Sequence, residues 1–354
     1  MKKVAIITLY GNSNFGNKLQ NYAVQETLKK YDFSVDNIIN TPCLNNKKNI
    51  LKNYLYVLKK EIIRKFLKKR TEREKAFLEF NKYINNTKKF FSFIELKKFS
   101  NYDYYFVGSD QIWNPELGGL RDLDLLTFTN KKKIAFSASF GIDSIPNEFK
   151  EKTRKALLEF DAISVREEKG KEIIQNLTSR NDIEVLVDPT MLLTTTEWDK
   201  VAKKPRMLNH EKYILCYFLG NISEEIKEKI KTYAEDNKCE IINILDPNSK
   251  YFSCGPSEFI YLEKHAFMVC TDSFHSSVFA ILYHVPFIVF NREGCKSSMN
   301  SRIITLLKKF NLSDRLYQDN FKIEENNQIN YSEVEKKLEN ERINSFTFLK
   351  KNIE

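Results

Sequence analysis

The residues best suited to chemistry stand in the segment MVCTDSFHSSVFAILYH, residues 268–284. The apolar start of this segment predicts a buried strand ending at Thr271, and Asp272 or Ser273 can cap the helix that follows. His275 would lie in the first turn, where free backbone N–H groups and the helix dipole attract a phosphate or carboxylate. A histidine there is positioned for proton transfer. The alternative is a helix-start histidine that its own loop satisfies.

Three arginines have positions that an anion site would use. Arg166 follows the strand-like run ISV, and its planar guanidinium suits bidentate capture of a carboxylate or phosphate. Pairing with Glu167 or Glu168 is the alternative. Arg292 also leaves an apolar run and Arg302 begins a predicted helix, so each could add positive charge to an anion pocket. A solvated surface position is the alternative for both.

Asp110 and Trp113 lie in the segment VGSDQIWNP, directly after a predicted buried strand. The carboxylate of Asp110 could accept a proton from a substrate hydroxyl. The indole of Trp113 could stack on the face of a sugar. The alternative is an aspartate that caps a helix and a tryptophan that packs in the core.

The loop GNSNFGNK, residues 11–18, has nearly the spacing of a phosphate-binding P-loop. It departs from that motif because Asn17 precedes Lys18, and no Ser or Thr follows the lysine. We therefore predict a strand-to-helix turn rather than a nucleotide site. In that turn, Asn14, Asn17 and Gln20 could offer amide groups to a sugar.

Alternating apolar runs and amphipathic stretches predict the elements that must position these residues. In the first half we expect strands at 4–9, 104–107, 132–141, 162–165 and 183–188, and helices at 18–30 and 147–160. In the second half we expect strands at 213–219, 240–245, 267–271 and 286–290, and helices at 223–236, 257–264 and 274–283. Several strands stop at polar or glycine residues before a helix. Because open parallel α/β sheets bind ligands beyond the carboxyl ends of their strands, we predict one site built from many loops.

The length of 354 residues predicts two domains of ordinary size. We place an N-terminal α/β domain at 1–190 and a linker at 191–211, where strand signals are few. A C-terminal α/β domain follows at 212–320, and a helical tail at 321–354. The predicted fold class is α/β, with two Rossmann-like domains and a C-terminal helix.

The net charge of +10 is unevenly distributed, since residues 45–75 carry twelve Lys or Arg and three Asp or Glu. Residues 49–69 predict a basic amphipathic helix, which could lie on an anionic membrane or pack on its domain as a surface helix. This single basic segment does not indicate nucleic-acid binding. No run of about 18 apolar residues predicts a membrane span, and the spacing of Cys and His predicts no metal site.

Seven motifs follow one another between residues 8 and 316: NFGNKLQNYAVQ, VGSDQIWNP, AFSASFG, SVREEKG, VDPTMLL, TDSFHSSVFAILYHVPFI and SRIITLLKKFNL. Together they resemble the polysaccharide pyruvyl transferase family. The resemblance implies a GT-B-like fold with a cleft between two Rossmann-like domains, the N-terminal one on the acceptor side and the C-terminal one on the donor side. It implies transfer of the pyruvyl group of phosphoenolpyruvate to a sugar of a cell-surface polysaccharide or its lipid-linked precursor, forming a pyruvate ketal. No metal or cofactor is implied, and the expected location is the cytoplasm at the inner face of the membrane.

The resemblance assigns acid–base work and phosphate contact to His275. The donor anion would contact Arg166, Ser273, Ser276, Arg292 and Arg302. Some family members carry an arginine two residues before the histidine, where this chain has Ser273. The missing charge must come from Arg292, Lys296 or Arg302, or the donor differs.

Two other functions fit parts of the sequence. A nucleotide-sugar-dependent glycosyltransferase would use the same GT-B-like architecture. A non-enzymatic anion- or membrane-binding protein would use the basic segment at 49–69. The last interpretation leaves the polar strand ends unexplained.

Overall fold

The structure, a computed structural model, describes residues 1–9, 11, 13–39, 55, 58–59, 70–84, 87–90, 93–99, 101–292, 300–318 and 329–354. Most of the predicted basic helix at 49–69, and Lys296, lie outside these residues, so the expected membrane contact stays a prediction. The chain divides into two compact units. Unit 1 comprises Met1–Thr71, Asn81–Thr190 and Thr347–Glu354, and unit 2 comprises Glu72–Phe80 and Met191–Phe346.

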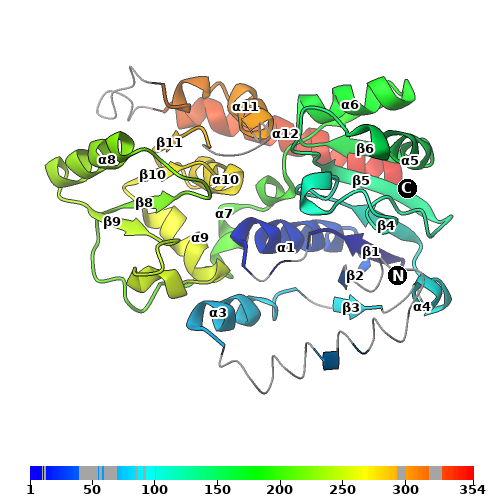
Figure 1. Cartoon of the computed structure of the whole chain (residues 1–354), viewed down its shortest axis with the longest axis horizontal. Helices are drawn as coiled ribbons and strands as arrows, with labels where there is room; N and C mark the ends of the chain where they lie inside the picture. Colours follow the sequence, from blue (N-terminus) through cyan, green and yellow to red (C-terminus); the bar gives the residue numbers. More distant parts are fainter. Residues whose placement is uncertain are drawn as a thin grey trace. The chain divides into compact units, whose positions relative to one another are not determined.

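Within the described residues, unit 1 is built on a seven-stranded parallel sheet in the order β3-β2-β1-β4-β5-β6-β7 (Figure 1). The strands are β1 (Lys3–Ile7), β2 (Ser34–Ile39), β3 (Thr87–Lys89), β4 (Tyr104–Val107), β5 (Lys132–Ala138), β6 (Ala162–Val165) and β7 (Glu184–Val185). The chain adds strands to one side of β1 and then to the other, so the order reverses between β1 and β4. Such a reversal is where open α/β sheets bind their ligands.

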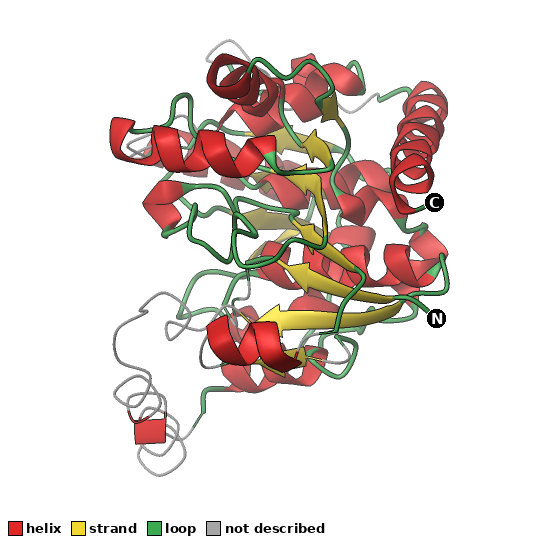
Figure 2. Cartoon of the chain, turned by 90° about the vertical axis from the view of Figure 1, so that its right-hand side faces the viewer, coloured by secondary structure: helices red, strands yellow, loops and turns green. Residues whose placement is uncertain are grey.

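Helices pack beside the strands of unit 1 (Figure 2). They are α1 (Phe15–Lys29), α4 (Phe93–Phe99), α5 (Asn147–Leu158) and α6 (Glu168–Thr178), with a short 3₁₀ turn, η2 (Pro115–Leu117). Strands β4 and β6 are buried along their whole length. Continuous apolar strands of this kind are typical of parallel sheets covered on both faces.

Unit 2 has, among its described residues, a four-stranded parallel sheet in the order β11-β10-β8-β9. Its strands are β8 (Tyr213–Tyr217), β9 (Glu240–Asn243), β10 (Met268–Thr271) and β11 (Phe287–Val289). Its helices are α3 (Glu72–Phe80), α7 (Thr195–Asp199), α8 (Glu224–Asp236), α9 (Pro256–His265), α10 (Phe274–Leu282), α11 (Asn300–Lys309) and most of α12 (Tyr331–Ile353). Its 3₁₀ turns are η4 (Lys250–Ser253) and η5 (Ser313–Arg315), while η3 (Pro189–Leu192) begins in unit 1 and ends in unit 2. Here the strand order reverses between β8 and β10.

The predicted strands and helices are present with small shifts of their ends. The helix expected at 18–30 begins at Phe15, because the side chain of Asn14 caps it and accepts a hydrogen bond from the backbone N–H of Asn17 at 3.2 Å. Among the described residues, no helix combines the length and apolar composition needed to cross a bilayer.

The division into units differs from the predicted domains in three places. The chain divides after Thr190, but residues 191–211 belong to unit 2, where Trp198 of α7 packs against Phe279 with ring centroids 4.9 Å apart. Helix α3 also belongs to unit 2, because the guanidinium of Arg73 donates hydrogen bonds to the backbone carbonyls of Ile244, which follows β9, and Phe252 in η4. The predicted helical tail at 321–354 is present as α12, but its residues are divided between the units, since those up to Phe346 belong to unit 2 and the last eight residues belong to unit 1.

Candidate functional site

Polar residues of unit 1 collect beyond the carboxyl ends of its strands. Thr8 follows β1, Ser109 and Asp110 follow β4, Arg166 follows β6, and Asp188 comes shortly after β7. The loops after β1 and β4 flank the point at which the strand order reverses. Hydrogen bonds join these five residues, so several loops combine at this edge of unit 1, and a ligand site there stays a prediction.

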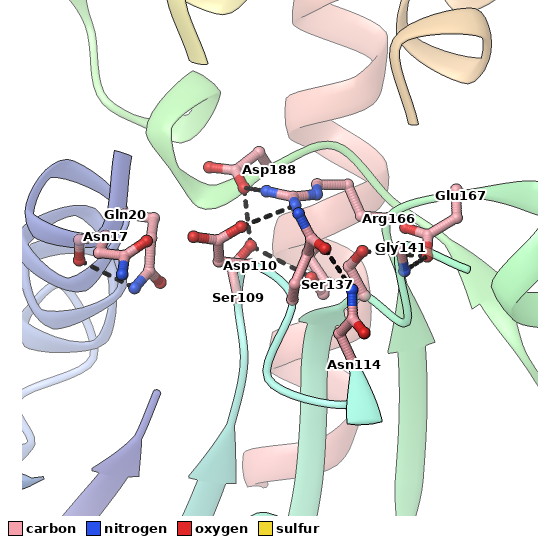
Figure 3. Close-up of polar contacts among 12 residues, drawn as sticks. Asn17, Gln20, Ser109, Asp110, Asn114, Ser137, Gly141, Arg166, Glu167 and Asp188 are labelled. Carbon is pink, nitrogen blue, oxygen red and sulfur yellow. Dashed lines mark hydrogen bonds and ion pairs between the residues drawn. The ribbon is translucent and has the colours of Figure 1, made fainter. Parts of the chain in front are cut away.

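Arg166 lies between two carboxylates (Figure 3). Its Nη1 donates to Asp188 Oδ2 at 2.5 Å and its Nη2 to Asp110 Oδ1 at 3.1 Å. The side chain is only 1% exposed. Burial alone would lower the pKa of the guanidinium, but the charges of Asp188, Asp110 and Glu167 raise that pKa above its ordinary value. Arg166 therefore stays charged and joins two loops.

The sequence left open a pairing of Arg166 with Glu167. The ion pairs of Arg166 that the structure shows are those with Asp110 and Asp188. Instead, Glu167 Oε1 accepts hydrogen bonds from the hydroxyl of Ser139 and from the backbone N–H groups of Phe140 and Gly141, at 3.0 to 3.3 Å. Glu167 thereby fixes the loop after β5, while its charge still acts on Arg166.

Asp188, like Thr8 and Ser109, belongs to this cluster although the sequence analysis did not name it as a site residue. Its Oδ2 also accepts a hydrogen bond from the hydroxyl of Ser109 at 2.7 Å, and its Oδ1 accepts from the N–H and hydroxyl of Thr190 at 3.0 and 2.7 Å. The side chain is fully buried. The available signal was a carboxylate that ends a strand-like run at the same sheet edge as Asp110 and Arg166.

The predicted amide residues of α1 connect to this cluster through Thr8. Gln20 Nε2 donates to the hydroxyl of Thr8 at 2.8 Å and to the carbonyl of Asn17 at 3.0 Å, and the Thr8 hydroxyl donates to the carbonyl of Ser109 at 3.1 Å. Gln20 is fully buried and Asn17 is half-buried. The side-chain oxygen of Asn14 accepts the hydrogen bond that caps α1. A role in sugar binding stays a prediction for all three.

The lysine of the P-loop-like spacing does not point toward a phosphate site. Lys18 is 1% exposed, and its Nζ donates to Asn81 Oδ1 at 2.7 Å. Burial lowers its pKa to about 7. This location agrees with the interpretation of the loop as a strand-to-helix turn.

Trp113 is placed differently from its predicted role in stacking on a sugar. The indole is fully buried, with Phe140 and Phe160 at centroid distances of 5.2 and 5.8 Å. Its Nε1 donates to the carbonyl of Asp124 at 3.0 Å. Because core side chains cover the ring, the packing alternative is correct and Trp113 is not an acceptor contact in this structure.

In unit 2, Asp272 organises the loops where the strand order reverses. Its two carboxylate oxygens accept hydrogen bonds from the backbone N–H groups of Leu219 and Gly220, which follow β8, each at 2.7 Å. Arg292, which follows β11, donates through Nε to the carboxylate at 3.0 Å and through Nη2 to the Asp272 carbonyl at 3.2 Å. The predicted anion-binding Arg292 is therefore held one residue before Ser273.

His275 lies in the first turn of α10, as the sequence predicts, and is 6% exposed. Ser273 is the N-cap residue, and in the described part of the chain its side chain makes no capping hydrogen bond. The first turn thus keeps the partial positive charge of its backbone N–H groups. Because the side chain of Ser273 does not cap these N–H groups, this helix end is suited to binding an anion.

Ser276, also expected to bind the donor, uses its hydroxyl elsewhere. It is fully buried, and its hydroxyl donates to Glu263 Oε1 of α9 at 2.5 Å. Burial raises the pKa of Glu263 well above its usual range, and the hydrogen bond from Ser276 offsets only part of this effect. Only the backbone of Ser276 therefore remains suited to a donor contact.

Arg302, the last of the predicted anion-binding arginines, is buried on α11. Its guanidinium carbon lies 6.0 Å from the centre of the Phe274 ring, within the range of a cation–π interaction. Phe274 in turn meets His275 edge to face, with centroids 5.4 Å apart. Arg302 thus brings positive charge to the side chains that begin α10.

A sequence model of the polysaccharide pyruvyl transferase family matches residues 14–294, most of the chain. The chain belongs to this family. A polysaccharide pyruvyl transferase is a transferase, so the protein is an enzyme. The match includes Asp110, Arg166, His275 and Arg292, while Arg302 lies beyond its end. No curated protein matches the sequence.

Solved structures similar to this transferase are nucleotide-sugar enzymes of GT-B-like fold. A UDP-GlcNAc 2-epimerase of Methanocaldococcus jannaschii is 14% identical with a TM-score of 0.53, and the alignment covers 96% of this chain and 92% of that one. A UDP-GlcNAc 2-epimerase of Neisseria meningitidis, bound to UDP-GlcNAc, is 13% identical with a TM-score of 0.50, over 99% and 100% of the two chains. At these identities the similarity establishes the fold: α/β, GT-B-like, with a C-terminal helix.

Proposed function

We propose that the protein transfers the pyruvyl group of phosphoenolpyruvate to a sugar of a cell-surface polysaccharide or its lipid-linked precursor, forming a pyruvate ketal. The observation that carries the proposal is His275, buried in the first turn of a helix whose N-cap side chain is not used for capping, within the chain's family match. No metal or other cofactor takes part in the proposed reaction. A lipid-linked acceptor would place the reaction at the inner face of the membrane, and sedimentation with anionic vesicles tests that location.

The start of α10 supplies what a donor with a phosphate and a carboxylate needs. Backbone N–H groups and the helix dipole favour one anionic group. Arg292, held by Asp272, brings a guanidinium to the residue before Ser273, and Arg302 adds a second one next to Phe274. We propose that Arg292 takes the place of the arginine that some family members carry at the position of Ser273.

The reaction balances with one proton donor and one proton acceptor. A proton adds to the methylene carbon of phosphoenolpyruvate, which becomes a methyl group, while a first sugar hydroxyl bonds to the central carbon. The C–O bond to phosphate then breaks, and a second hydroxyl of the same sugar bonds to that carbon. The two hydroxyl protons replace the proton added to carbon and protonate the leaving phosphate. We assign the proton transfer near the phosphate to His275, and contact with the acceptor hydroxyl to Asp110.

Turnover with phosphoenolpyruvate tests the proposal directly. The full chain is mixed with phosphoenolpyruvate and a panel of glycans and lipid-linked oligosaccharides, and released phosphate and the new ketal methyl signal are measured. His275→Gln should lower kcat by about 100-fold or more, since a positioned acid–base group contributes that much. His210→Gln, at an exposed histidine of unit 2, should leave kcat unchanged.

Two outcomes would overturn this assignment. Wild-type activity in the His275→Gln variant would remove His275 from the chemistry. Turnover of a UDP- or GDP-sugar, with no binding of phosphoenolpyruvate in calorimetry, would instead identify a nucleotide-sugar-dependent glycosyltransferase.

A further inference from the structure

We propose that Glu263 is a positioning residue of the donor site: its uncharged carboxyl group holds the hydroxyl of Ser276 and thereby fixes the first turn of α10, which carries His275. The inference rests on the proposed function and deepens it, because it extends the donor site from the start of α10 to the helix that packs behind it. Glu263 acts through Ser276 and does not itself contact the donor.

Helix α9 packs against α10 through an aromatic pair and a polar pair. The rings of Phe259 and Phe279 meet edge to face, with centroids 6.0 Å apart. One turn further along α9, Oε1 of Glu263 accepts the hydrogen bond from the Ser276 hydroxyl at 2.5 Å. Because Ser276 directly follows His275, the polar pair lies at the end of α10 where the anion site is proposed.

The bond to Glu263 determines where the Ser276 hydroxyl points. Without such an acceptor, a helical serine can donate to the carbonyl three or four residues before it, which often bends the helix. Ser277 makes a bond of this kind, since its hydroxyl donates to the carbonyl of Ser273 at 3.0 Å. For Ser276 those carbonyls belong to Asp272 and Ser273, so a change of partner would act on the residues that begin α10.

The surroundings of Glu263 keep its carboxyl group uncharged. The side chain is fully buried, and its Oε2 has no hydrogen-bond partner among the described residues. Glu263 lies in the last turn of α9, at the negative end of the helix dipole. Its charge would act on Tyr213 and Tyr217 of β8, where burial raises the pKa of each phenol. Lys264, in the same turn, pairs with Asp199 of α7.

The uncharged state of Glu263 matters to an anion at the start of α10. An ionised carboxylate bonded to Ser276 would place a negative charge beside the first turn. That charge would offset the partial positive charge of the backbone N–H groups and would repel both the phosphate and the carboxylate of the donor. An uncharged carboxyl group supplies the acceptor that Ser276 needs without this repulsion.

Two replacements of Glu263 separate the acceptor from the charge. Glu263→Gln is uncharged and keeps an oxygen for the Ser276 hydroxyl, whereas Glu263→Leu has a similar volume and removes the acceptor. Glu263→Leu should lower kcat with the acceptor sugar by about tenfold or more, because His275 shifts with the turn. Glu263→Gln should restore most of this loss. In calorimetry at pH 6 it should bind phosphoenolpyruvate within about twofold of wild type, since the bond is kept and no charge changes.

A double-mutant cycle measured on kcat shows whether Glu263 and Ser276 act as one unit. Ser276→Ala removes the donor of the same bond and should lower kcat to a similar extent, so it also serves if Glu263→Leu does not fold. The double variant Glu263→Leu/Ser276→Ala should lose no more activity than either single variant, because neither partner is left unsatisfied. A merely structural role would lower the urea midpoint without this coupling in kcat.

Matched variants elsewhere in unit 2 give the controls. Ser345→Ala, at a fully buried serine of α12, and Glu228→Leu, at an exposed glutamate of α8, should change neither kcat nor donor affinity. About tenfold tighter binding of phosphoenolpyruvate by Glu263→Gln at pH 6 would show that the wild-type carboxyl group is ionised, and would overturn the inference. Additive losses in the cycle, or wild-type kcat in Ser276→Ala, would also overturn it. Failure of the wild type to bind phosphoenolpyruvate would overturn the proposed function instead.

Discussion

Each unit of this enzyme contains buried ionisable side chains that form hydrogen bonds near the candidate site. In unit 1, the buried side chains of Arg166 and Asp188 carry opposite charges and form an ion pair. In unit 2, Glu263 is fully buried and meets the hydroxyl of Ser276, and its Oε2 has no hydrogen-bond partner among the described residues. A carboxyl group in such a place is favoured in its neutral form.

The buried Glu263 predicts a dependence of stability on pH. Because its pKa is raised in the folded state, the folded protein keeps a proton that the unfolded chain loses once the pH exceeds the ordinary glutamate value. The stability associated with neutral Glu263 is fully present below that value and falls as pH rises toward the folded-state pKa, by about 1.4 kcal/mol per pH unit. Glu263→Gln removes this loss and can keep the bond from Ser276.

The measurement is urea unfolding at pH 5 and pH 8. The free energy of unfolding of Glu263→Gln, relative to wild type, should be higher at pH 8 than at pH 5. Glu228→Gln, at an exposed residue of α8, should show no such difference. A Glu263→Gln difference that is constant with pH would show that Glu263 is ionised in the folded protein.

At this scale, sequence reasoning placed the polar residues at the ends of their strands and missed the partners with which they pair. Strand-end polar residues such as Asp110 and Arg166 were visible because the apolar runs before them are clear. Their pairing through Asp188 was not, since it depends on which strands become neighbours in the sheet. For the same reason Trp113 suggested a ligand contact, although the chain packs three aromatic rings there.

At the scale of elements, the loop after β4 depends on one glycine. Gly108 has φ +109°, and a Cβ atom there would lie 2.4 Å from the carbonyl oxygen of Phe136 on β5. A side chain at this position is therefore excluded both by backbone conformation and by the neighbouring strand. The loop can carry Ser109 and Asp110 to the sheet edge only with glycine before them.

Gly108→Ala should destabilise the protein by about 3 kcal/mol or more, from the left-handed backbone and the collision with β5. It should also lower kcat, because Ser109 and Asp110 move with the loop. Gly118→Ala is the matched control, since Gly118 has φ +76° but no atom within 4 Å of the added Cβ. Only the conformational cost of about 1–2 kcal/mol applies there. Urea unfolding compares the two, and equal losses would contradict the collision.

The types of the elements were predictable, and their membership in a unit was not. Hydrophobic periodicity marks a helix or strand, so the parallel α/β pattern could be predicted from the sequence. Helix α3 belongs to unit 2 although it precedes most of unit 1 in the chain. That assignment depends on contacts such as those of Arg73 with two distant carbonyls, which no local pattern encodes.

At the scale of the whole molecule, each unit contains one of the chain's two tryptophans. Trp113 lies in the core of unit 1 and Trp198 in that of unit 2, and both are fully buried. Indole fluorescence changes when such a residue is exposed by unfolding. Trp113→Phe therefore leaves a signal from unit 2 alone, and Trp198→Phe leaves one from unit 1 alone.

These two variants locate the donor. A ligand that binds only the folded form stabilises it by about 2.7 kcal/mol when present at 100 times its Kd. With phosphoenolpyruvate at that concentration and no acceptor, the urea midpoint reported by Trp198 should rise, because His275, Arg292 and Arg302 all lie in unit 2. The midpoint reported by Trp113 should rise less. A rise confined to the Trp113 signal would place the donor on unit 1, where Arg166 would then have to bind it.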